Sequence, residues 1–432
     1  MGLGAAQAGK SKTVAHRANN GMCLMSRKWP WNSTLARVLR YLQETMFASR
    51  EAILTCVACL WLGCEGRVAM RVYRDAGARP AGADAAQTAA PAVACPPGQT
   101  PRVVELGTPV KLDLLFMIDD SLSMSEEQAN LARNFPRLIE ALKSMPAGLP
   151  DLHLGVVSSD LGAGNAALAG PCGSSVGDRG VLQVRDGCGL DAAKGRFLIS
   201  EAGGTNTNFT GDISDVFACL AELGTGGCGY EHQLQSVRLA LSGFVAENNG
   251  FLRSDAHLAV VYITDEDDCS APADSSMYGG AVSGQDSSLR CSLAGHLCNG
   301  SPPPAAVFST PLPNCSAAPD GGGKLIPVQT FIDEMRLLRT QSVSVSVIGG
   351  WPDDVATANY AIGYDTTSSQ PDVLSSIPIC HSVNGSAAVG LRMKQLADAF
   401  GSAGKIISIC QDDFSNAMGQ VGDLINTTVE CQ

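Results

Sequence analysis

Apolar residues recur in two alternating patterns after about residue 105, short continuous runs and helical stripes. In the runs, polar residues do not alternate with apolar ones, which is typical of strands covered on both faces of a sheet. These predicted strands are 111–118, 152–158, 258–264, 343–348 and 405–409. Apolar residues spaced three and four apart predict helices; these begin at about Ser125 and cover 212–222, 231–244, 328–339, 391–400 and 413–428. Strands that alternate with helices predict an α/β fold, a mostly parallel central sheet with helices on both faces.

Two stretches interrupt this alternation, at about 160–210 and 268–324. The first is rich in Gly, Ser and Cys, and the second is irregular and carries four cysteines. Stretches of this composition are typical of loops rather than of buried elements. We therefore expect a single domain over residues 105–432 that carries two Cys-rich loop insertions.

The segment before this domain is expected to direct export. Residues 52–62, AILTCVACLWL, carry no charge, and eleven residues are too few to span a bilayer but match a signal-peptide core. The Gly-Cys pair that follows resembles the lipobox of bacterial lipoproteins, in which the cysteine is lipidated. We predict a signal peptide at 46–64, with Cys64 as the lipidation site; an ordinary cleaved signal is the alternative.

The flanks of this signal fit the same picture. Residues 1–45 would be an over-extended N-terminus or a long, basic leading region of the signal. Residues 65–104 are rich in Ala, Pro and Gly and have no apolar period, which predicts a linker. The expected location is the cell envelope, periplasmic or at the cell surface, with a lipid anchor in the membrane.

The charge distribution excludes nucleic acid as a partner. The chain carries 30 basic and 42 acidic side chains, a net charge of −12, and eight of the basic residues lie within residues 1–63. The remainder is therefore still more acidic, and it would repel a phosphate backbone.

Twelve of the 16 cysteines follow Cys64. An even number without a paired C-x-x-C motif favours disulfides over zinc sites, in keeping with an oxidising compartment. Short spacings suggest two local bridges, Cys172–Cys188 and Cys219–Cys228.

Polar residues gather where the predicted strands end. The first strand runs into Asp-Asp-Ser-Leu-Ser at 119–123, and a later one ends in Thr-Asp-Glu-Asp-Asp at 264–268. Between them, Gly-Thr-Gly-Gly at 224–227 joins two predicted helices. Ligands of open α/β sheets bind at the carboxyl ends of strands. Carboxylates and hydroxyls without imidazole or thiolate favour Mg²⁺, Mn²⁺ or Ca²⁺.

The D-x-S-x-S motif, a glycine-flanked Thr and an Asp ending a later strand together resemble the von Willebrand factor type A (vWA) domain and its metal-ion-dependent adhesion site (MIDAS). The resemblance covers residues 108–430 in element order and is most specific at FMIDDSLSMS. It implies a Rossmann-like fold and a bound divalent cation, with Mg²⁺ preferred. Carried across residue by residue, it implies the ligands Asp119, Ser121, Ser123, Thr225 and Asp265.

Two points of this assignment stay open. Thr205, in Gly-Gly-Thr-Asn, is closer to the common family loop, but it precedes the helix at 212–222, and Thr225 is therefore preferred. The family pattern does not include the acids Glu266, Asp267 and Asp268. For the last two we expect a solvated acidic loop.

The implied function is binding rather than catalysis, and no catalytic residue is predicted. Asp119 and Asp265 would just neutralise a dication, so the cation would keep affinity for an outside anionic oxygen. In the vWA family a partner's carboxylate completes the metal shell, which predicts a protein or glycan partner. Two alternatives are a metal-dependent hydrolase that activates water through Asp119 or Glu266, and a disulfide-stapled envelope scaffold with a vestigial metal site.

Overall fold

The computed structural model describes residues 95–97, 99–101, 110–166, 170–173, 177–278, 287–307, 312–338, 342–352, 364–366 and 373–431. The expected signal peptide, Cys64 and most of the linker lie outside these residues. Within the described residues, every helix is too short or too polar to cross a bilayer.

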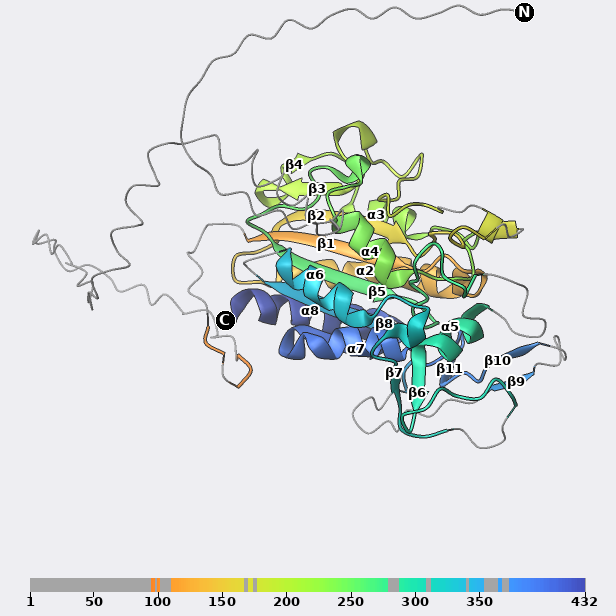
Figure 1. The fold of residues 1–432 in the computed structure, drawn as a ribbon. Coiled ribbons are helices and arrows are strands. Elements are labelled where there is room, and N and C mark those ends of the chain that lie inside the picture. Colours follow the sequence, from red (N-terminus) through yellow and green to blue (C-terminus); the bar gives the residue numbers. More distant parts are fainter. Residues whose placement is uncertain are drawn as a thin grey trace, which may run out of the picture. The chain divides into compact units, whose positions relative to one another are not determined.

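A seven-stranded sheet forms the centre of the described part (Figure 1). Its order is β13-β8-β5-β1-β2-β3-β4. The strands are β1 (Lys111–Ile118), β2 (Asp151–Ser158), β3 (Leu198–Glu201), β4 (Asn206–Thr207), β5 (His257–Ile263), β8 (Val343–Gly349) and β13 (Gly404–Ser408). The pairs from β13 to β2 are parallel, and β3 and β4 add two antiparallel pairs. The predicted α/β fold with a mostly parallel sheet is confirmed.

Helices cover both faces of this sheet (Figure 1). One face packs against α2 (Ser125–Lys143), α3 (Ile213–Ala221) and α8 (Ser415–Glu430). The other packs against α4 (Gln233–Leu241), α6 (Val328–Leu337) and α7 (Leu391–Ala399).

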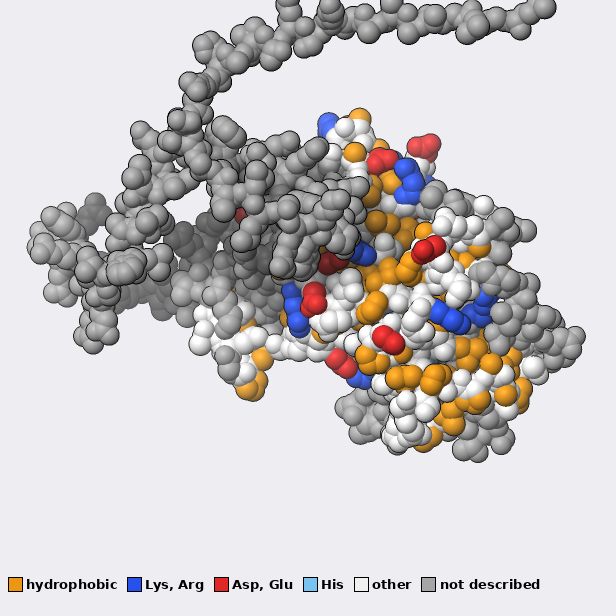
Figure 2. Space-filling view, viewed as in Figure 1, with side chains coloured by type: hydrophobic (Ala, Val, Ile, Leu, Met, Phe, Trp, Pro, Cys, Tyr) orange, Lys and Arg blue, Asp and Glu red, His pale blue; other side chains and the backbone are white. Residues whose placement is uncertain are grey.

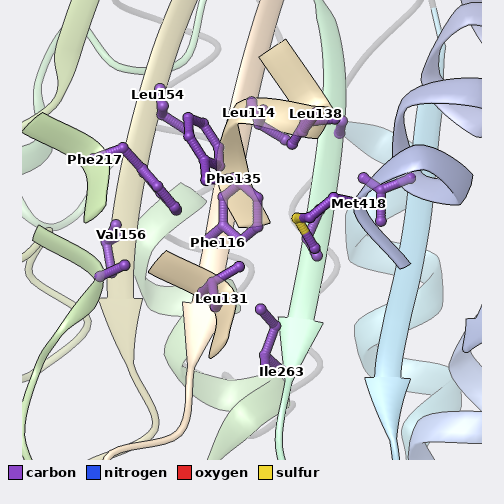
Figure 3. Close-up of a cluster of buried hydrophobic side chains, with 14 of the residues drawn as sticks. Leu114, Phe116, Leu131, Phe135, Leu138, Leu154, Val156, Phe217, Ile263 and Met418 are labelled. Atoms are coloured by element: carbon purple, nitrogen blue, oxygen red, sulfur yellow. The ribbon is translucent and has the colours of Figure 1, made fainter. Parts of the chain in front are cut away.

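Strand β1 shows why its sequence is continuously apolar. Leu114 and Phe116 point into the first core, whereas Leu115 and Met117 point into the second. Phe116 stacks its ring edge against Phe135 of α2, with centroids 5.9 Å apart (Figure 3). Full burial of each such side chain stabilises the fold by about 1.5–3 kcal/mol. Because β1 is buried on both faces, its sequence does not alternate between apolar and polar residues.

The insertions carry more regular structure than the sequence pattern predicts. The stretch expected to be irregular at 268–324 contains α5 (Ser287–Gly295) and a ribbon of β6 (His296–Cys298) and β7 (Cys315–Ala317). Two further ribbons pair β9 (Tyr364–Thr366) with β10 (Leu374–Ser376), and β11 (Cys380–Ser382) with β12 (Gly385–Ala387).

All twelve cysteines after Cys64 pair in the structure, which confirms the expectation of disulfides. The bridges are Cys95–Cys431, Cys172–Cys228, Cys188–Cys219, Cys269–Cys291, Cys298–Cys315 and Cys380–Cys410. The two local pairings predicted from short spacing are wrong, because the four cysteines pair crosswise. Cys188 and Cys219 pack with the core under α2 and α3, whereas Cys172 and Cys228 pack around Tyr230 in a separate apolar cluster.

Peptide mapping under non-reducing conditions should recover this crosswise pairing. Proteolysis is expected to release one linked peptide pair with Cys172 and Cys228, and another with Cys188 and Cys219. Each pair should separate after reduction. Recovery of a Cys172–Cys188 peptide would show that the sequence-based pairing is right.

Charged side chains are dispersed over the described surface on the face shown in Figure 2. Lys and Arg lie singly or in small groups there, among acidic and uncharged side chains. That face therefore offers no continuous basic stripe along which a phosphate backbone could lie.

Candidate functional site

The two predicted aspartates lie at the ends of adjacent parallel strands. Strands β1 and β5 pair in register up to Ile118 and Ile263. Immediately beyond, the Asp119 amide donates to the Ile263 carbonyl at 3.0 Å. Asp265 follows β5 by two residues, so both carboxylates belong to the carboxyl edge of the sheet, as expected for a ligand site of this fold.

Hydrogen bonds connect four of the five predicted ligands. The Ser121 amide donates to Asp119 Oδ1 at 2.8 Å, and the Ser121 and Ser123 hydroxyls lie 3.2 Å apart. The Ser123 side chain in turn bonds to the Asp265 carboxylate. On its other side, Asp119 Oδ2 accepts from the Thr264 hydroxyl at 2.6 Å. The first and third predicted segments therefore meet.

The loop that carries Thr225 is held against the same segment. Gln128 of α2 donates to the carbonyls of Asp119 and Gly224, at 2.8 and 2.9 Å, and accepts from the Gly224 amide at 3.0 Å. The Gly227 amide donates to the Asp120 carbonyl at 2.9 Å. A Cβ on Gly227 would lie 2.4 Å from Asp120 Oδ1, so glycine permits this close approach. These anchors hold the loop on either side of Thr225, which is half-buried.

The alternative residue, Thr205, lies at the opposite edge of the sheet. Its hydroxyl donates to the Ala202 carbonyl at 2.9 Å. The Ala202 amide donates to Asp151, the first residue of β2. The amino end of β2 is far along the strand from the carboxyl end, where Asp119 and Asp265 lie. Thr205 is therefore not a ligand candidate.

Ser123 lies just before α2, whose N-cap is Met124, and this cap makes no side-chain hydrogen bond. A short 3₁₀ turn, Leu122–Met124, precedes the helix and directs the Ser123 hydroxyl toward Ser121 and Asp265. Ser123 is exposed, and Leu122 is 82% exposed, so the site opens to solvent at this turn.

The electrostatics of these residues fit a cation. Asp119 and Asp265 are both buried, and Asp265 Oδ1 has no hydrogen-bond partner among the described residues. Burial raises the pKa of Asp119, and burial together with the charges of Glu266 and Asp119 raises the pKa of Asp265 well above its ordinary value. Buried carboxylates of this kind are destabilising unless they are paired or bind a metal.

The donor set also fits a hard cation. Among the described residues, no three His, Cys, Asp or Glu side chains form a metal-binding group by themselves. A cation at this site would take the hydroxyls of Ser121, Ser123 and Thr225 as further oxygen ligands beside the two carboxylates. Mg²⁺, Mn²⁺ and Ca²⁺ prefer such oxygen donors.

Further buried acids surround the two aspartates. Burial, followed by the charges of Asp119 and Asp160, raises the pKa of Asp120 to about 8. Burial also raises the pKa of Glu127 to about 7, with smaller contributions from Glu126 and Asp119. Glu231 is buried as well, and burial and the charge of Glu266 raise its pKa well above the ordinary value. The site therefore holds more carboxyl groups than the motif alone indicates, and burial favours their neutral forms.

Asp267 and Asp268 are not solvated, which corrects the expectation from the sequence. Both are buried, with 3% and 0% of their surface exposed. Arg392, at the start of α7, donates to Asp268 Oδ2 at 2.8 Å, and His296 Nε2 lies 2.6 Å from Asp267 Oδ2. Arg392 and His296 thus hold these two acids, and they anchor the loop that carries Asp265.

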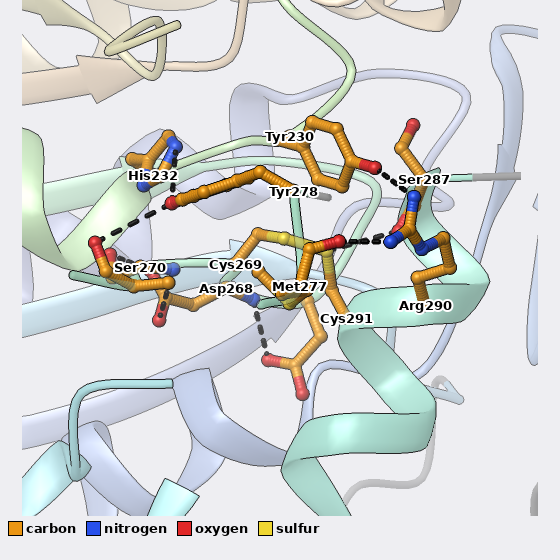
Figure 4. Close-up of a disulfide and its surroundings, with 12 residues drawn as sticks. Tyr230, His232, Asp268, Cys269, Ser270, Met277, Tyr278, Ser287, Arg290 and Cys291 are labelled. Carbon is orange, nitrogen blue, oxygen red and sulfur yellow. Dashed lines mark hydrogen bonds between the residues drawn. A yellow bond between two sulfur atoms is a disulfide. The ribbon is translucent and has the colours of Figure 1, made fainter. Parts of the chain in front are cut away.

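A disulfide extends this anchor (Figure 4). Cys269 directly follows Asp268 and is bonded to Cys291 of α5. On the same helix, Arg290 donates to the Tyr230 hydroxyl at 2.5 Å (Figure 4). The insertion therefore clamps both the segment after Asp265 and the segment that leads from Thr225 into α4.

The raised pKa values predict a pH dependence of the metal-free chain. The pKa of Asp120 is raised from 3.8 to about 8 and that of Glu127 from 4.5 to about 7. Their contribution to stability is therefore fully present below about pH 4 and is lost as the pH rises toward about 8. Denaturant unfolding in chelator should give higher stability at about pH 5 than at about pH 8. Added Mg²⁺ should reduce this difference, and higher stability at pH 8 in chelator would contradict the assignment.

Several residues that build the site carried no signal in the sequence. Gln128 joins two of the loops, and the Ser159 hydroxyl donates to Asp119 Oδ1 at 3.2 Å and to Asp120 Oδ1 at 3.1 Å. Ser159 directly follows β2, so its place at the end of a predicted strand is the one signal that could have identified it.

Comparisons with known proteins give distant similarities. No protein-family model matches the sequence, and no curated protein matches it. Proximal thread matrix protein 1 from the mussel byssus is 11% identical, with a TM-score of 0.32 over 74% of this chain and 49% of that chain. The same protein with a zinc-occupied MIDAS motif is 11% identical, with a TM-score of 0.30 over 75% and 47%. The pilus adhesin SpaC from Lactobacillus rhamnosus GG is 9% identical, with a TM-score of 0.32 over 75% and 30%. This chain therefore spans about half or less of the length of these structures, and likeness of this degree assigns neither family nor partner.

Proposed function

We propose that this chain is a vWA-like protein that binds a protein or glycan partner through a divalent cation. Asp119, Ser121, Ser123, Thr225 and Asp265 would hold the cation, and a carboxylate of the partner would complete its coordination. The observation that carries the proposal is the hydrogen-bonded chain from Asp119 through the two serines to Asp265, whose buried Oδ1 has no partner among the described residues.

Mg²⁺ is the preferred ion of this proposal, with Mn²⁺ and Ca²⁺ as alternatives. Carboxylate and hydroxyl oxygens are hard ligands, and the buried surroundings strengthen their attraction for a small dication. The cation would offset the negative charge of the buried aspartates, and it would supply the positive centre that an acidic group on the partner recognises.

The surface beside the ligands supports binding to another macromolecule. Leu122 lies between two proposed ligands and is 82% exposed, although leucine is among the residues most often buried. A partner that covers Leu122 would gain hydrophobic stabilisation next to the polar contact with the cation. The partner would then contact an apolar side chain, Leu122, and the charged cation next to it.

Export and a lipid anchor belong to the same proposal. The predicted signal at 46–64 would direct export, Cys64 would carry the lipid, and 65–104 would link it to the folded domain. The six disulfides support an oxidising compartment outside the cytoplasm. The proposed location is therefore the cell envelope.

A melting experiment tests cation binding. Mg²⁺ at about 100 times its dissociation constant should stabilise the folded chain by roughly 2.7 kcal/mol, a shift of a few degrees that chelator reverses. Asp119→Ala should remove the shift, whereas Asp255→Asn, which alters an exposed ion pair with Lys111, should keep it. A wild-type chain that shows no shift with Mg²⁺, Mn²⁺ or Ca²⁺ would favour the scaffold alternative.

Partner capture tests the binding function itself. The wild-type chain should retain a partner from envelope extracts with Mg²⁺ and release it with chelator, and Asp119→Ala should retain none. Equal capture by the variant would exclude a cation-mediated mechanism. Metal-dependent turnover of generic esters or phosphates, lost in the same variant, would instead support the hydrolase alternative.

Leu122→Ser should separate partner contact from cation binding. Loss of a buried leucine contact of about 1.5–3 kcal/mol predicts roughly tenfold or greater weakening of capture. The Mg²⁺-dependent melting shift should stay at its wild-type size, because the Leu122 side chain points into solvent. Unchanged capture would remove Leu122 from the proposed contact surface.

A further inference from the structure

Strand β13 is the outermost strand at one edge of the sheet, and it pairs with β8 on its inner side. Just beyond β13, the Ile409 amide donates to the Gly349 carbonyl at 2.8 Å. Because the main chain of a parallel strand faces the same neighbour at every second residue, Ile407 also bonds to β8. The main-chain groups of Ile406 and Ser408 therefore face the outer edge, away from β8.

A pocket of about 600 Å³ lies along this outer edge. Three consecutive residues of β13 line it, Ile406, Ile407 and Ser408. Since successive side chains of a strand point to opposite faces of a sheet, a pocket that reaches all three lies beside the strand rather than on one face. Its other walls include His381 of β11, Gln411 and Asp412 after β13, and Asn416 and Gln420 of α8.

Within the described residues, part of this edge has no hydrogen-bond partner. The Ser408 carbonyl accepts from the Gln411 side chain at 2.9 Å. The described part of the chain provides no such partner for the Ile406 amide and carbonyl, although Ile406 is half-buried. The strand at the other edge, β4, has only two residues, so β13 is the edge that is long enough to accept another strand.

The side chains around this edge favour a peptide that carries a basic residue. Asn416 and Gln420, one turn apart on α8, present carboxamides that can both donate to and accept from a main chain. Asp412 is exposed, and among the described residues that line the pocket it is the one acid, with no Lys or Arg beside it. The edge therefore offers main-chain hydrogen bonds next to a single negative charge.

We propose that an extended segment of a partner protein binds along β13 as a further strand of the sheet. Its main chain would bond to the outward-facing groups of Ile406 and Ser408, and a Lys or Arg side chain of the segment would face Asp412. This inference goes beyond the proposed function and does not depend on it, because none of these residues is a proposed cation ligand.

A second copy of this chain fits the same edge less well. The edge of β13 lies in a hollow with α8 as one wall, and a second copy would bring the same wall to the contact. Two recessed edges of this kind cannot approach to the spacing of about 5 Å that paired strands need. A single extended segment has no such walls and can enter the hollow.

Short random peptides displayed on phage, selected on the full chain in chelator, provide the probe. The selected peptides should be rich in β-branched residues and carry a Lys or Arg. A synthetic copy of the tightest one, at about 100 times its dissociation constant, should slow hydrogen exchange of the Ile406 amide roughly 100-fold. Because chelator is present throughout, failure of the proposed cation site leaves this result unchanged.

An N-methyl scan of the selected peptide tests for strand pairing. A methyl group on an amide that faces β13 should weaken binding roughly tenfold, and one on the next amide, which faces away, should leave it within about twofold. The effect should therefore alternate along the peptide. A scan without this alternation would overturn the proposal, and so would a selection that yields no peptide above background.

Asp412→Asn tests the charged contact. This variant should weaken binding about fivefold at low salt, and high salt should reduce the difference. Asp423→Asn, at an exposed position of α8 that is not in the pocket lining, is the matched control and should bind like the wild type. Equal binding by both variants would exclude the contact with Asp412.

The chain without peptide tests the other occupants. In the proposed state the Ile406 amide exchanges freely and sedimentation velocity shows a monomer. Strong protection of this amide in a dimer would assign the edge to a second copy. The same protection in a monomer would assign the edge to another segment of this chain, and either result would overturn the proposal.

Discussion

Replacement of Arg392 by methionine should destabilise the folded chain by about 3–5 kcal/mol, the cost expected when one partner of a buried ion pair is removed. Arg392 is fully buried, and its guanidinium donates to Asp268 Oδ2 from Nε and Nη2, at 3.1 and 2.8 Å. Methionine fills a similar volume but leaves the Asp268 carboxylate uncompensated in the interior. Denaturant unfolding measures the loss directly.

The matched control is Arg137→Met in α2. Arg137 pairs with Glu140 at 2.9 Å, but both side chains are 62% exposed. Surface pairs of this kind contribute about 0–1 kcal/mol. Equal, small losses in the two variants would contradict the anchoring role of Arg392. Addition of Asp268→Asn to Arg392→Met should recover part of the loss, because the uncompensated charge is then removed.

Asp265→Asn should change stability in opposite directions with and without a cation. In chelator the variant should be more stable than the wild type at about pH 8, because a neutral amide replaces a buried carboxylate that other acids surround. With Mg²⁺ at about 100 times its dissociation constant, the wild type should gain roughly 2.7 kcal/mol and the variant almost nothing. The wild type should therefore be the less stable of the two proteins in chelator and the more stable one with Mg²⁺.

Melting curves of both proteins, recorded in chelator and in Mg²⁺, measure this change in their relative stability. The exposed variant Asp255→Asn should follow the wild type in both conditions. An Asp265→Asn variant that gains as much from Mg²⁺ as the wild type would show that Asp265 does not hold the ion. A variant less stable than the wild type in chelator would mean that the Asp265 carboxylate is already compensated without metal.

The fold was predictable because its core elements follow simple periodic patterns. The run 111–118 is apolar throughout because both faces of β1 are covered, and the stripe of α2 faces one core. Helix α5 escaped prediction because it lies in a Cys-rich stretch and is attached through Cys269–Cys291 rather than through a long apolar stripe. The crosswise pairing of Cys172 and Cys188 depends on which cluster each one packs in, and sequence spacing does not encode that.

The candidate site was predictable only where its residues are close in sequence or end a strand. Asp119, Ser121 and Ser123 form a local motif, and Asp265 ends a recognisable apolar run. The burial of Asp267 and Asp268 could not be predicted, because it depends on His296 and Arg392, which are distant in the sequence. Glu231 stands alone between Tyr230 and His232 in the sequence, and only the fold shows that it is buried.

The central claim is that three distant segments hold one cation, and metal-specific anomalous diffraction from crystals soaked in Mn²⁺ tests it most directly. The account predicts an anomalous peak within coordination distance of Asp119, Ser123 and Asp265, with Thr225 on the same ion. A well-ordered site in Mn²⁺-soaked crystals that shows no peak there, or a peak that contacts none of these side chains, would contradict the account.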